Sequence, residues 1–137
     1  MWIETYKGLV FPSHCDFNEH MDVGNYVGRF EEASWHLFAL AGIDRSYFDE
    51  FNRGMVTVEQ KLKYFQEVLP GDCIIVRSKL EEVRNSSVFS LHQMYILGNE
   101  SPCAECRLSV VHLDRKLRKS APFPANIRKR LEAFIQT

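Results

Sequence analysis

The 137-residue chain lacks long apolar runs, an excess of one charge, and stretches rich in glycine, proline or serine. No segment approaches the roughly 20 apolar residues that a membrane-spanning helix needs. The 17 basic and 18 acidic residues give a net charge of −1, whereas a nucleic-acid-binding surface is expected to be strongly basic. The hydrophobic fraction of 45% is too high for a disordered chain. We therefore expect one globular domain over residues 1–137, with no nucleic-acid partner and no membrane span.

Cysteine is also sparse, with Cys15, Cys73, Cys103 and Cys106 only. The N-terminal residues lack the basic-then-apolar order of a signal peptide, so a cytoplasmic location and free thiols are expected rather than a disulfide framework. Cys103 and Cys106 have the spacing of half a zinc site, but no second pair or histidine completes it. In an extended strand, residues three positions apart face opposite sides. We predict neither a metal nor a cofactor.

One long apolar helix is predicted over residues 26–41. Its apolar residues recur at helical spacing on one face, and the apolar band is wide, which is typical of a helix buried in the middle of its domain. Asp22 or Asn25 can cap its start, and Gly42 can supply the left-handed residue at its end.

Alternating apolar residues and turn signals predict a short first strand and four long ones, followed by a terminal helix after Pro122 and Pro124. Short turns between the long strands predict an antiparallel meander, and one sheet with a helix across one face satisfies the α+β pattern. The strands are expected at residues 3–10, 55–68, 73–83, 88–97 and 104–113.

The segment Cys15-Asp16-Phe17-Asn18-Glu19-His20-Met21, followed by Asn25-Tyr26 at the helix start, resembles the 4-hydroxybenzoyl-CoA thioesterase family of hotdog proteins. The aromatic pair Tyr64-Phe65 before the turn Pro70-Gly71-Asp72 also resembles that family. The resemblance implies a hotdog fold, in which a five-stranded antiparallel sheet wraps around a long central helix and a C-terminal helix follows. It further implies acyl-CoA thioesterase activity and a homodimer or a dimer of dimers with the active site at the seam. Asp22-Val23-Gly24 stands where many members carry an asparagine pair, which bears on the substrate subclass.

Asp16 is the predicted catalytic group. A thioester carbonyl needs a nucleophile or a general base and stabilisation of the oxyanion, and a carboxylate can serve in either of the first two roles. Unpaired N–H groups at a helix start can polarise the carbonyl, and the resemblance puts this donor near Val23 or Gly24. Asn18 and His20 are expected to assist. In the alternative interpretation Asp16 only caps the loop, Asn18 forms an Asx turn, and His20 braces the loop.

Asn25 and Tyr26 are weaker candidates for substrate binding, and Tyr26 is better explained as a core aromatic at the helix start. Glu31 and Glu32 on the helix are rival carboxylates, although a solvated helix face explains them as well. Cys15, paired with a nearby histidine, is a rival nucleophile.

The strand over residues 55–68 is expected to supply residues to the pocket of a neighbouring subunit. Thr57, Glu59 and Gln60 are the candidates, but if Val56 and Val58 face inward, Thr57 and Glu59 are ordinary surface residues. The phosphates of coenzyme A call for basic groups near the pocket mouth. The available ones are Lys61, Lys63, Arg84, Arg115, Lys116, Arg118 and Lys119.

Two other functions fit the same fold. One is a non-catalytic module that binds acyl thioesters. The other is a hotdog hydratase or dehydratase, although the sequence contains no motif that pairs a histidine with an acid on the helix.

Overall fold

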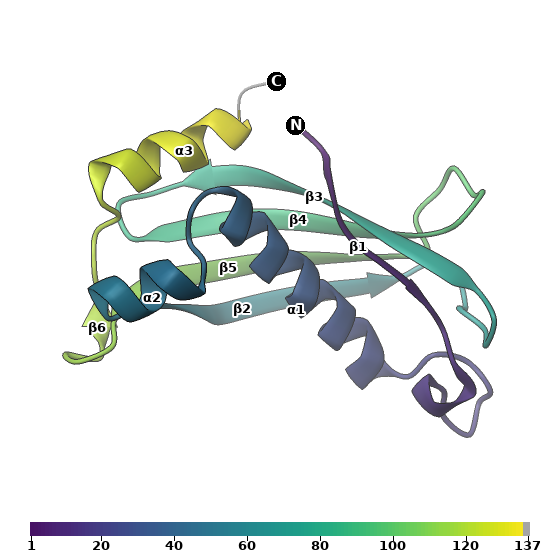
Figure 1. The fold of residues 1–137 in the computed structure, drawn as a ribbon. Coiled ribbons are helices and arrows are strands. Elements are labelled where there is room, and N and C mark those ends of the chain that lie inside the picture. Colours follow the sequence, from purple (N-terminus) through teal and green to yellow (C-terminus); the bar gives the residue numbers. More distant parts are fainter. Residues whose placement is uncertain (136–137) are drawn as a thin grey trace.

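A curled antiparallel sheet with helices on one face forms the protein (Figure 1). The computed structural model describes residues 1–135. The strands are β1 (Ile3–Leu9), β2 (Arg53–Tyr64), β3 (Cys73–Val83), β4 (Ser87–Ile96), β5 (Ala104–Asp114) and the two-residue β6 (Lys119–Ser120). The helices are a short 3₁₀ turn η1 (Pro12–His14), α1 (Val23–Leu40), α2 (Arg45–Phe51) and α3 (Ala125–Ile135). Within this range no helix is long and apolar enough to cross a membrane.

The strand order β1-β3-β4-β5-β2 corrects the predicted meander of four strands. Only β3, β4 and β5 follow one another in space. β2 pairs with β5, from Arg53 opposite Asp114 to Tyr64 opposite Ala104, and so forms the far edge of the sheet. The turn signals showed correctly that the chain reverses after residue 64, but a turn does not determine which edge the next strand joins. The connection 65–72 crosses the end of the sheet, and β3 then pairs with β1.

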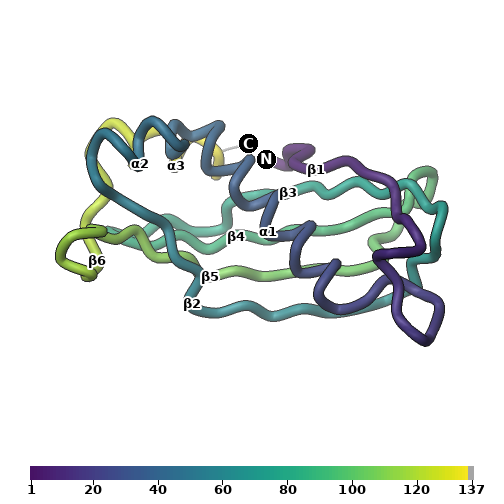
Figure 2. The backbone as a smooth tube through the Cα atoms, turned by 60° about the horizontal axis from the view of Figure 1, so that its bottom comes forward, coloured from purple at the N-terminus to yellow at the C-terminus, as the bar shows by residue number. Residues whose placement is uncertain are grey.

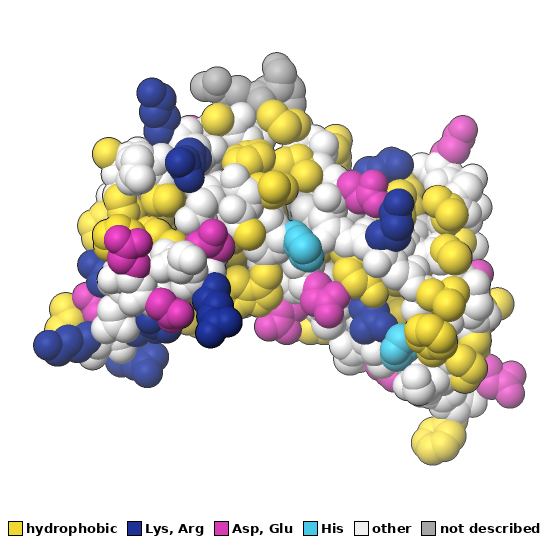
Figure 3. Space-filling model, viewed as in Figure 1, with side chains coloured by type: hydrophobic (Ala, Val, Ile, Leu, Met, Phe, Trp, Pro, Cys, Tyr) yellow, Lys and Arg dark blue, Asp and Glu magenta, His cyan; other side chains and the backbone are white. Residues whose placement is uncertain are grey.

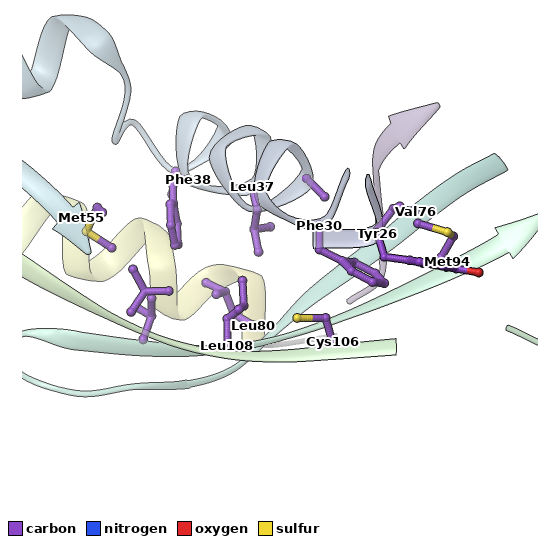
Figure 4. Close-up of a cluster of buried hydrophobic side chains, with 14 of the residues drawn as sticks. Tyr26, Phe30, Leu37, Phe38, Met55, Val76, Leu80, Met94, Cys106 and Leu108 are labelled. Carbon is purple, nitrogen blue, oxygen red and sulfur yellow. The ribbon is translucent and has the colours of Figure 1, made fainter. Parts of the chain in front are cut away.

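Helix α1 lies across the concave face of the sheet, as Figures 1 and 2 show. Asp22 caps it by accepting a hydrogen bond from the N–H of Asn25, so the helix begins three residues before the predicted Tyr26. Gly42, at φ +89°, supplies the left-handed residue after its end, as predicted. Figure 4 shows its inner side chains pointing at the sheet, among them Tyr26 and Phe30, which pack with core residues of β3, β4 and β5.

The opposite side of α1 is not covered by any residue between 1 and 135. Trp35 is 42% exposed and Leu40 57% exposed. The apolar band read from the sequence is therefore wider than the face that the sheet buries. This excess of apolar surface lies beside β2, where the candidate site is found.

Helices α2 and α3 cover the end of the concave face that lies opposite the start of α1 (Figure 2). Helix α3 packs on β3 and buries Ile127 and Leu131. Helix α2, which the sequence patterns did not indicate, is capped by Asp44 and buries Tyr47. The Tyr47 hydroxyl donates to Nε2 of His112 at 2.8 Å, because Nδ1 of His112 donates to the Ala121 carbonyl at 2.7 Å.

A chain of hydroxyl groups holds a second buried histidine in the core. Nδ1 of His92 is hydrogen-bonded to the Ser78 hydroxyl, and Nε2 lies 2.9 Å from that of Ser90. Ser78 is in turn 2.7 Å from Thr5 in β1. His92 is fully buried, and this burial lowers its pKa to about 3. The ring is therefore neutral in the folded protein at ordinary pH.

Candidate active site

Three pockets lie along the groove between α1 and β2. One of them, called the loop pocket below, lies at the C-terminal end of β2 beside the loop 15–21. Its volume is about 400 Å³. Figure 3 shows this side of the molecule recessed between the α2 end and the end that carries the loop 15–21. The residues lining the loop pocket are Asp16, His20, Met21, Val23, Tyr26, Tyr64, Phe65, Gln66 and Glu67.

The predicted catalytic loop is a tight hairpin. Cys15 and Met21 form an isolated antiparallel bridge, and the N–H of Asp16 donates to the His20 carbonyl at 3.1 Å. Glu19 takes the left-handed conformation, at φ +64°, that closes the turn. The N–H of Met21 donates to the Val68 carbonyl at 2.8 Å, which fixes the hairpin to the β2–β3 connection. Asp16 is thereby held at the edge of the loop pocket.

Asp16 uses one carboxylate oxygen in the loop and leaves the other open. Its Oδ1 accepts the N–H of Asn18 at 2.8 Å, which forms an Asx turn. Its Oδ2 has no hydrogen-bond partner among the described residues, and the side chain is exposed. Asp16 therefore forms the hydrogen bond that the loop-capping alternative predicts, and it also keeps a free oxygen that can act on a substrate. The side chain of Asn18 is exposed and does not line the pocket.

His20 is half-buried and fixed in one tautomer. Its Nδ1 lies 3.1 Å from the Met21 carbonyl, and since a carbonyl only accepts hydrogen bonds, Nδ1 carries the proton. Nε2 then bears a lone pair. An imidazole lining the same pocket as Asp16 can accept or relay a proton there.

Val23, the first residue of α1, lines this pocket, and Gly24 follows it in the helix without lining the pocket. No acceptor within residues 1–135 is recorded for the N–H groups of Val23 or Gly24, the first two positions of the helix. Asn25 is occupied differently: its Nδ2 donates to both oxygens of Asp22, and its Oδ1 accepts from Arg29. These bonds from Asn25 hold the pKa of Asp22 below its usual value. Asn25 therefore serves the helix start rather than facing the pocket.

Tyr26 and Tyr64 form the apolar wall of the loop pocket. Their rings meet edge to face, with centroids 4.9 Å apart. Burial raises the pKa of Tyr26 to about 12, so its hydroxyl keeps its proton. Glu67 adds a second carboxylate to the pocket, which sequence reasoning missed because it lies in an irregular connection without a periodic pattern.

The middle pocket, of about 340 Å³, lies beside the centre of β2. Thr57 and Gln60 line it and Glu59 does not, because a bulge at Val58 interrupts the alternation of β2. Glu59 pairs with Ser109 on the opposite face of the sheet. Thr57 is not the ordinary surface residue of the alternative interpretation, since it pairs with the buried Val110, and Val56 lines the same pocket. Of the two helix acids, Glu31 lines this pocket and its neighbour Glu32 does not.

The arginine pocket, of about 610 Å³, lies at the N-terminal end of β2 under α2. Arg115 and Arg118 line it, as do Arg45 and Arg53, which sequence reasoning did not select. Figure 3 shows Lys and Arg side chains gathered at this β6 end of the molecule. Arg53 is held by Asp114 at 3.1 Å. The predicted Lys61 and Lys63 pair with residues on the other face of the sheet, opposite Arg107 and Glu105.

The cysteines do not form a reactive or metal-binding cluster in the described part of the chain. Cys103 and Cys106 both face the core, contrary to the prediction of opposite faces, because Cys103 precedes β5 and does not follow its alternation. Burial raises their pKa values to about 11 and about 12. The pKa of Cys15 is also raised, chiefly by desolvation, which disfavours a thiolate nucleophile.

An antiparallel sheet curled around a long helix, with an acidic loop at the helix start, defines a hotdog domain. Solved structures agree: a Staphylococcus aureus protein in complex with CoA superposes with a TM-score of 0.91 at 15% identity, over 98% of this chain and 85% of its own.

Comparison with protein families and curated proteins places the chain more narrowly. Residues 10–131 match the thioesterase-like superfamily. The betainyl-CoA thioesterase of Pseudomonas aeruginosa is 27% identical over 134 residues, covering 98% of this chain and 84% of the relative. The L-carnitine dehydrogenase/betainyl-CoA thioesterase of Rhizobium meliloti is 24% identical over 121 residues, covering 88% of this chain and 24% of its own length. The chain belongs to the thioesterase-like superfamily, and it is a thioester hydrolase.

Proposed function

We propose that this protein hydrolyses an acyl-CoA thioester to the free acid and CoA in the loop pocket. One observation carries the proposal: a carboxylate with a free oxygen, Asp16, lines a pocket beside the unpaired N–H groups of Val23 and Gly24. Support comes from the names of both curated relatives and from the structural neighbour in complex with CoA.

The reaction needs an attacking oxygen and a site for the developing negative charge. Oδ2 of Asp16 either attacks the thioester carbon, forming an anhydride that water then cleaves, or removes a proton from the attacking water. In both routes the C–S bond breaks and the CoA sulfur leaves with the electron pair and takes up a proton. The N–H groups of Val23 and Gly24, at the positive end of α1, are proposed to hold the carbonyl oxygen.

The supporting residues have distinct roles in this proposal. The N–H of Asn18 orients Asp16 through the Asx turn. Nε2 of His20 is free to relay the proton toward the leaving group, because Nδ1 is tied to the Met21 carbonyl. The arginine pocket keeps a net positive charge, although Asp49 pairs with Arg45 and Arg115 and Asp114 pairs with Arg53. This charge suits the phosphates of CoA, since guanidinium groups bind phosphate oxygens in pairs.

We further propose that two copies pair along β2 and complete the site. β2 is an unpaired edge of the sheet, and Val56 and Val58 on it are 45% and 62% exposed. A long apolar edge strand favours pairing with a second chain. If the two β2 strands run antiparallel, the loop pocket of one copy faces the other two pockets of its partner. Phe17, fully exposed at the tip of the catalytic loop, is then covered.

The test is Asp16→Asn, which keeps the oxygen that accepts from Asn18 but removes the charge. We expect release of free thiol from acyl-CoA to fall about 10²–10³-fold, the range for loss of a catalytic acid or base, with an unchanged circular dichroism spectrum. Glu19→Gln is the matched control, because Glu19 lies in the same hairpin outside the pocket, and it should retain activity within about twofold.

Other results would contradict the proposal. An Asp16→Asn enzyme with more than half of the wild-type rate would remove Asp16 from catalysis, and loss of activity in Glu67→Gln would assign its role to the second carboxylate. Binding of acyl-CoA by the wild type without thiol release indicates a binding module, and a modified acyl chain without free thiol indicates a hydratase.

A further inference from the structure

The middle pocket differs from its two neighbours in charge. Glu31 is the only charged residue that lines it, and the rest of its wall is apolar apart from Ser34, Thr57 and Gln60. The arginine pocket, by contrast, contains four guanidinium groups against two carboxylates, Asp44 and Asp49. The middle pocket thus carries one negative charge and no compensating cation.

Three aromatic residues, Phe30, Trp35 and Phe38, line the pocket together with this carboxylate. Trp35 lies one turn of α1 after Glu31 and lines both the middle and the arginine pockets. Its ring stands nearly perpendicular to those of Phe38 and Phe48, with centroids 6.3 and 5.6 Å away at 87° and 89°. Trp35 is 42% exposed, so part of the indole remains open to a ligand. The exposed part of the indole offers one aromatic wall to a ligand, because Phe38 is buried and Phe48 lines the arginine pocket instead.

The chemistry of such a wall favours one kind of ligand. The negative faces of aromatic rings attract cations, and indole does so most strongly. A quaternary ammonium group donates no hydrogen bonds, so rings and a nearby carboxylate suit it better than hydroxyl or carbonyl acceptors would. Glu31 would repel an anionic acyl group, and a neutral acyl group would gain no charge interaction with this carboxylate.

We propose that the middle pocket receives the acyl group and selects a small cationic one of the quaternary ammonium class, with Glu31 as the specificity residue and Trp35 as its aromatic partner. The inference rests on the proposed thioesterase function and adds the substrate class to it. The volume of about 340 Å³ admits a small acyl group. Asp16 would act on the thioester while Glu31 and Trp35 hold the charged end.

The experiment compares two thioesters of the same shape. Betainyl-CoA carries a trimethylammonium group, and 3,3-dimethylbutanoyl-CoA carries a tert-butyl group in its place. We expect wild-type kcat/KM to favour the cationic substrate by about tenfold, the combined effect of one charge interaction and one contact between a cation and an aromatic ring. Glu31→Gln should lose most of this preference by lowering kcat/KM for betainyl-CoA, while the value for the neutral thioester stays within about twofold.

Glu32→Gln is the matched control, since Glu32 is the neighbouring acid on the same helix, is exposed like Glu31, and lies outside the pocket. It should keep the full preference. Equal kcat/KM for the two thioesters in the wild type, or the same preference in Glu31→Gln, overturns the inference but leaves the thioesterase proposal standing. Turnover of other acyl-CoA thioesters but of neither of these two also overturns the inference, whereas release of thiol from no acyl-CoA overturns the thioesterase proposal.

A binding measurement tests the pocket without turnover. Tetramethylammonium chloride, titrated against potassium chloride at equal ionic strength, should shift the indole N–H resonance of Trp35. Trp2 serves as an internal control, because its ring already carries Lys79 Nζ at 4.8 Å and lies far from the pocket in the sheet. The Trp35 shift should vanish in Glu31→Gln. An equal shift in that variant, or no shift in the wild type, contradicts the inference.

Discussion

Acid should destabilise this protein through His92 in particular. The folded-state pKa of His92 is about 3, against a usual value of 6.5 for the unfolded chain. Between these values the unfolded state binds a proton that the folded state does not, so stability is full above pH 6.5 and falls as the pH drops toward 3. From pH 7 to pH 5 this one residue is expected to remove about 2 kcal/mol from the free energy of unfolding.

The assay compares the wild type with His92→Gln, whose amide can still bond to the Ser78 and Ser90 hydroxyls but does not titrate. Urea unfolding, followed by tryptophan fluorescence at one protein concentration, is measured at pH 7 and at pH 5. The variant is less stable at pH 7 because the amide fits the site less well. Its loss between pH 7 and pH 5 should be about 2 kcal/mol smaller than that of the wild type. Equal losses in the two proteins would refute the reasoning, since all other titrating groups are shared.

Two further predictions concern the edge strand and the α2 contact. Val58→Lys places a charge on the exposed bulge of β2, and sedimentation should show a dimeric wild type and a largely monomeric variant; a monomeric wild type at tens of micromolar would contradict the pairing. Tyr47→Phe removes the donor to Nε2 of His112 inside the core, and urea unfolding should show a loss of about 1–3 kcal/mol. An unchanged midpoint would mean that another donor replaces the hydroxyl.

Much of the local structure could be predicted from the sequence, because it depends on neighbouring residues. The helical spacing of Tyr26, Phe30 and Leu37 identified the buried face of α1, and all three are buried. Gly71 and Gly98, both at φ +94°, occupy the turns that their neighbours indicated. Helix α2 escaped notice because it is only seven residues long, too short for a period of 3.6 to stand out.

The residues of the groove could not be assigned in the same way. The bulge at Val58 shifts the faces of β2, so that Thr57 and Gln60 point to the middle pocket and Glu59 does not. A bulge is set by the pairing with β5 and leaves no clear pattern in the strand itself. Glu31 looked like a surface residue of a helix, and only the position of β2 beside α1 gives it a pocket.

By itself, the sequence determined the helix, the long strands, most of the turns and the acidic loop that contains Asp16, since periodicity, capping and turn chemistry act over a few residues. The tertiary structure decided that β2 pairs with β5 rather than with β3, and this choice leaves β2 as an open edge beside the exposed side of α1. That pairing depends on contacts between residues about 50 apart, such as Met55 with His112. No local pattern encodes them, and they build the groove in which the thioester, its acyl group and CoA are proposed to bind.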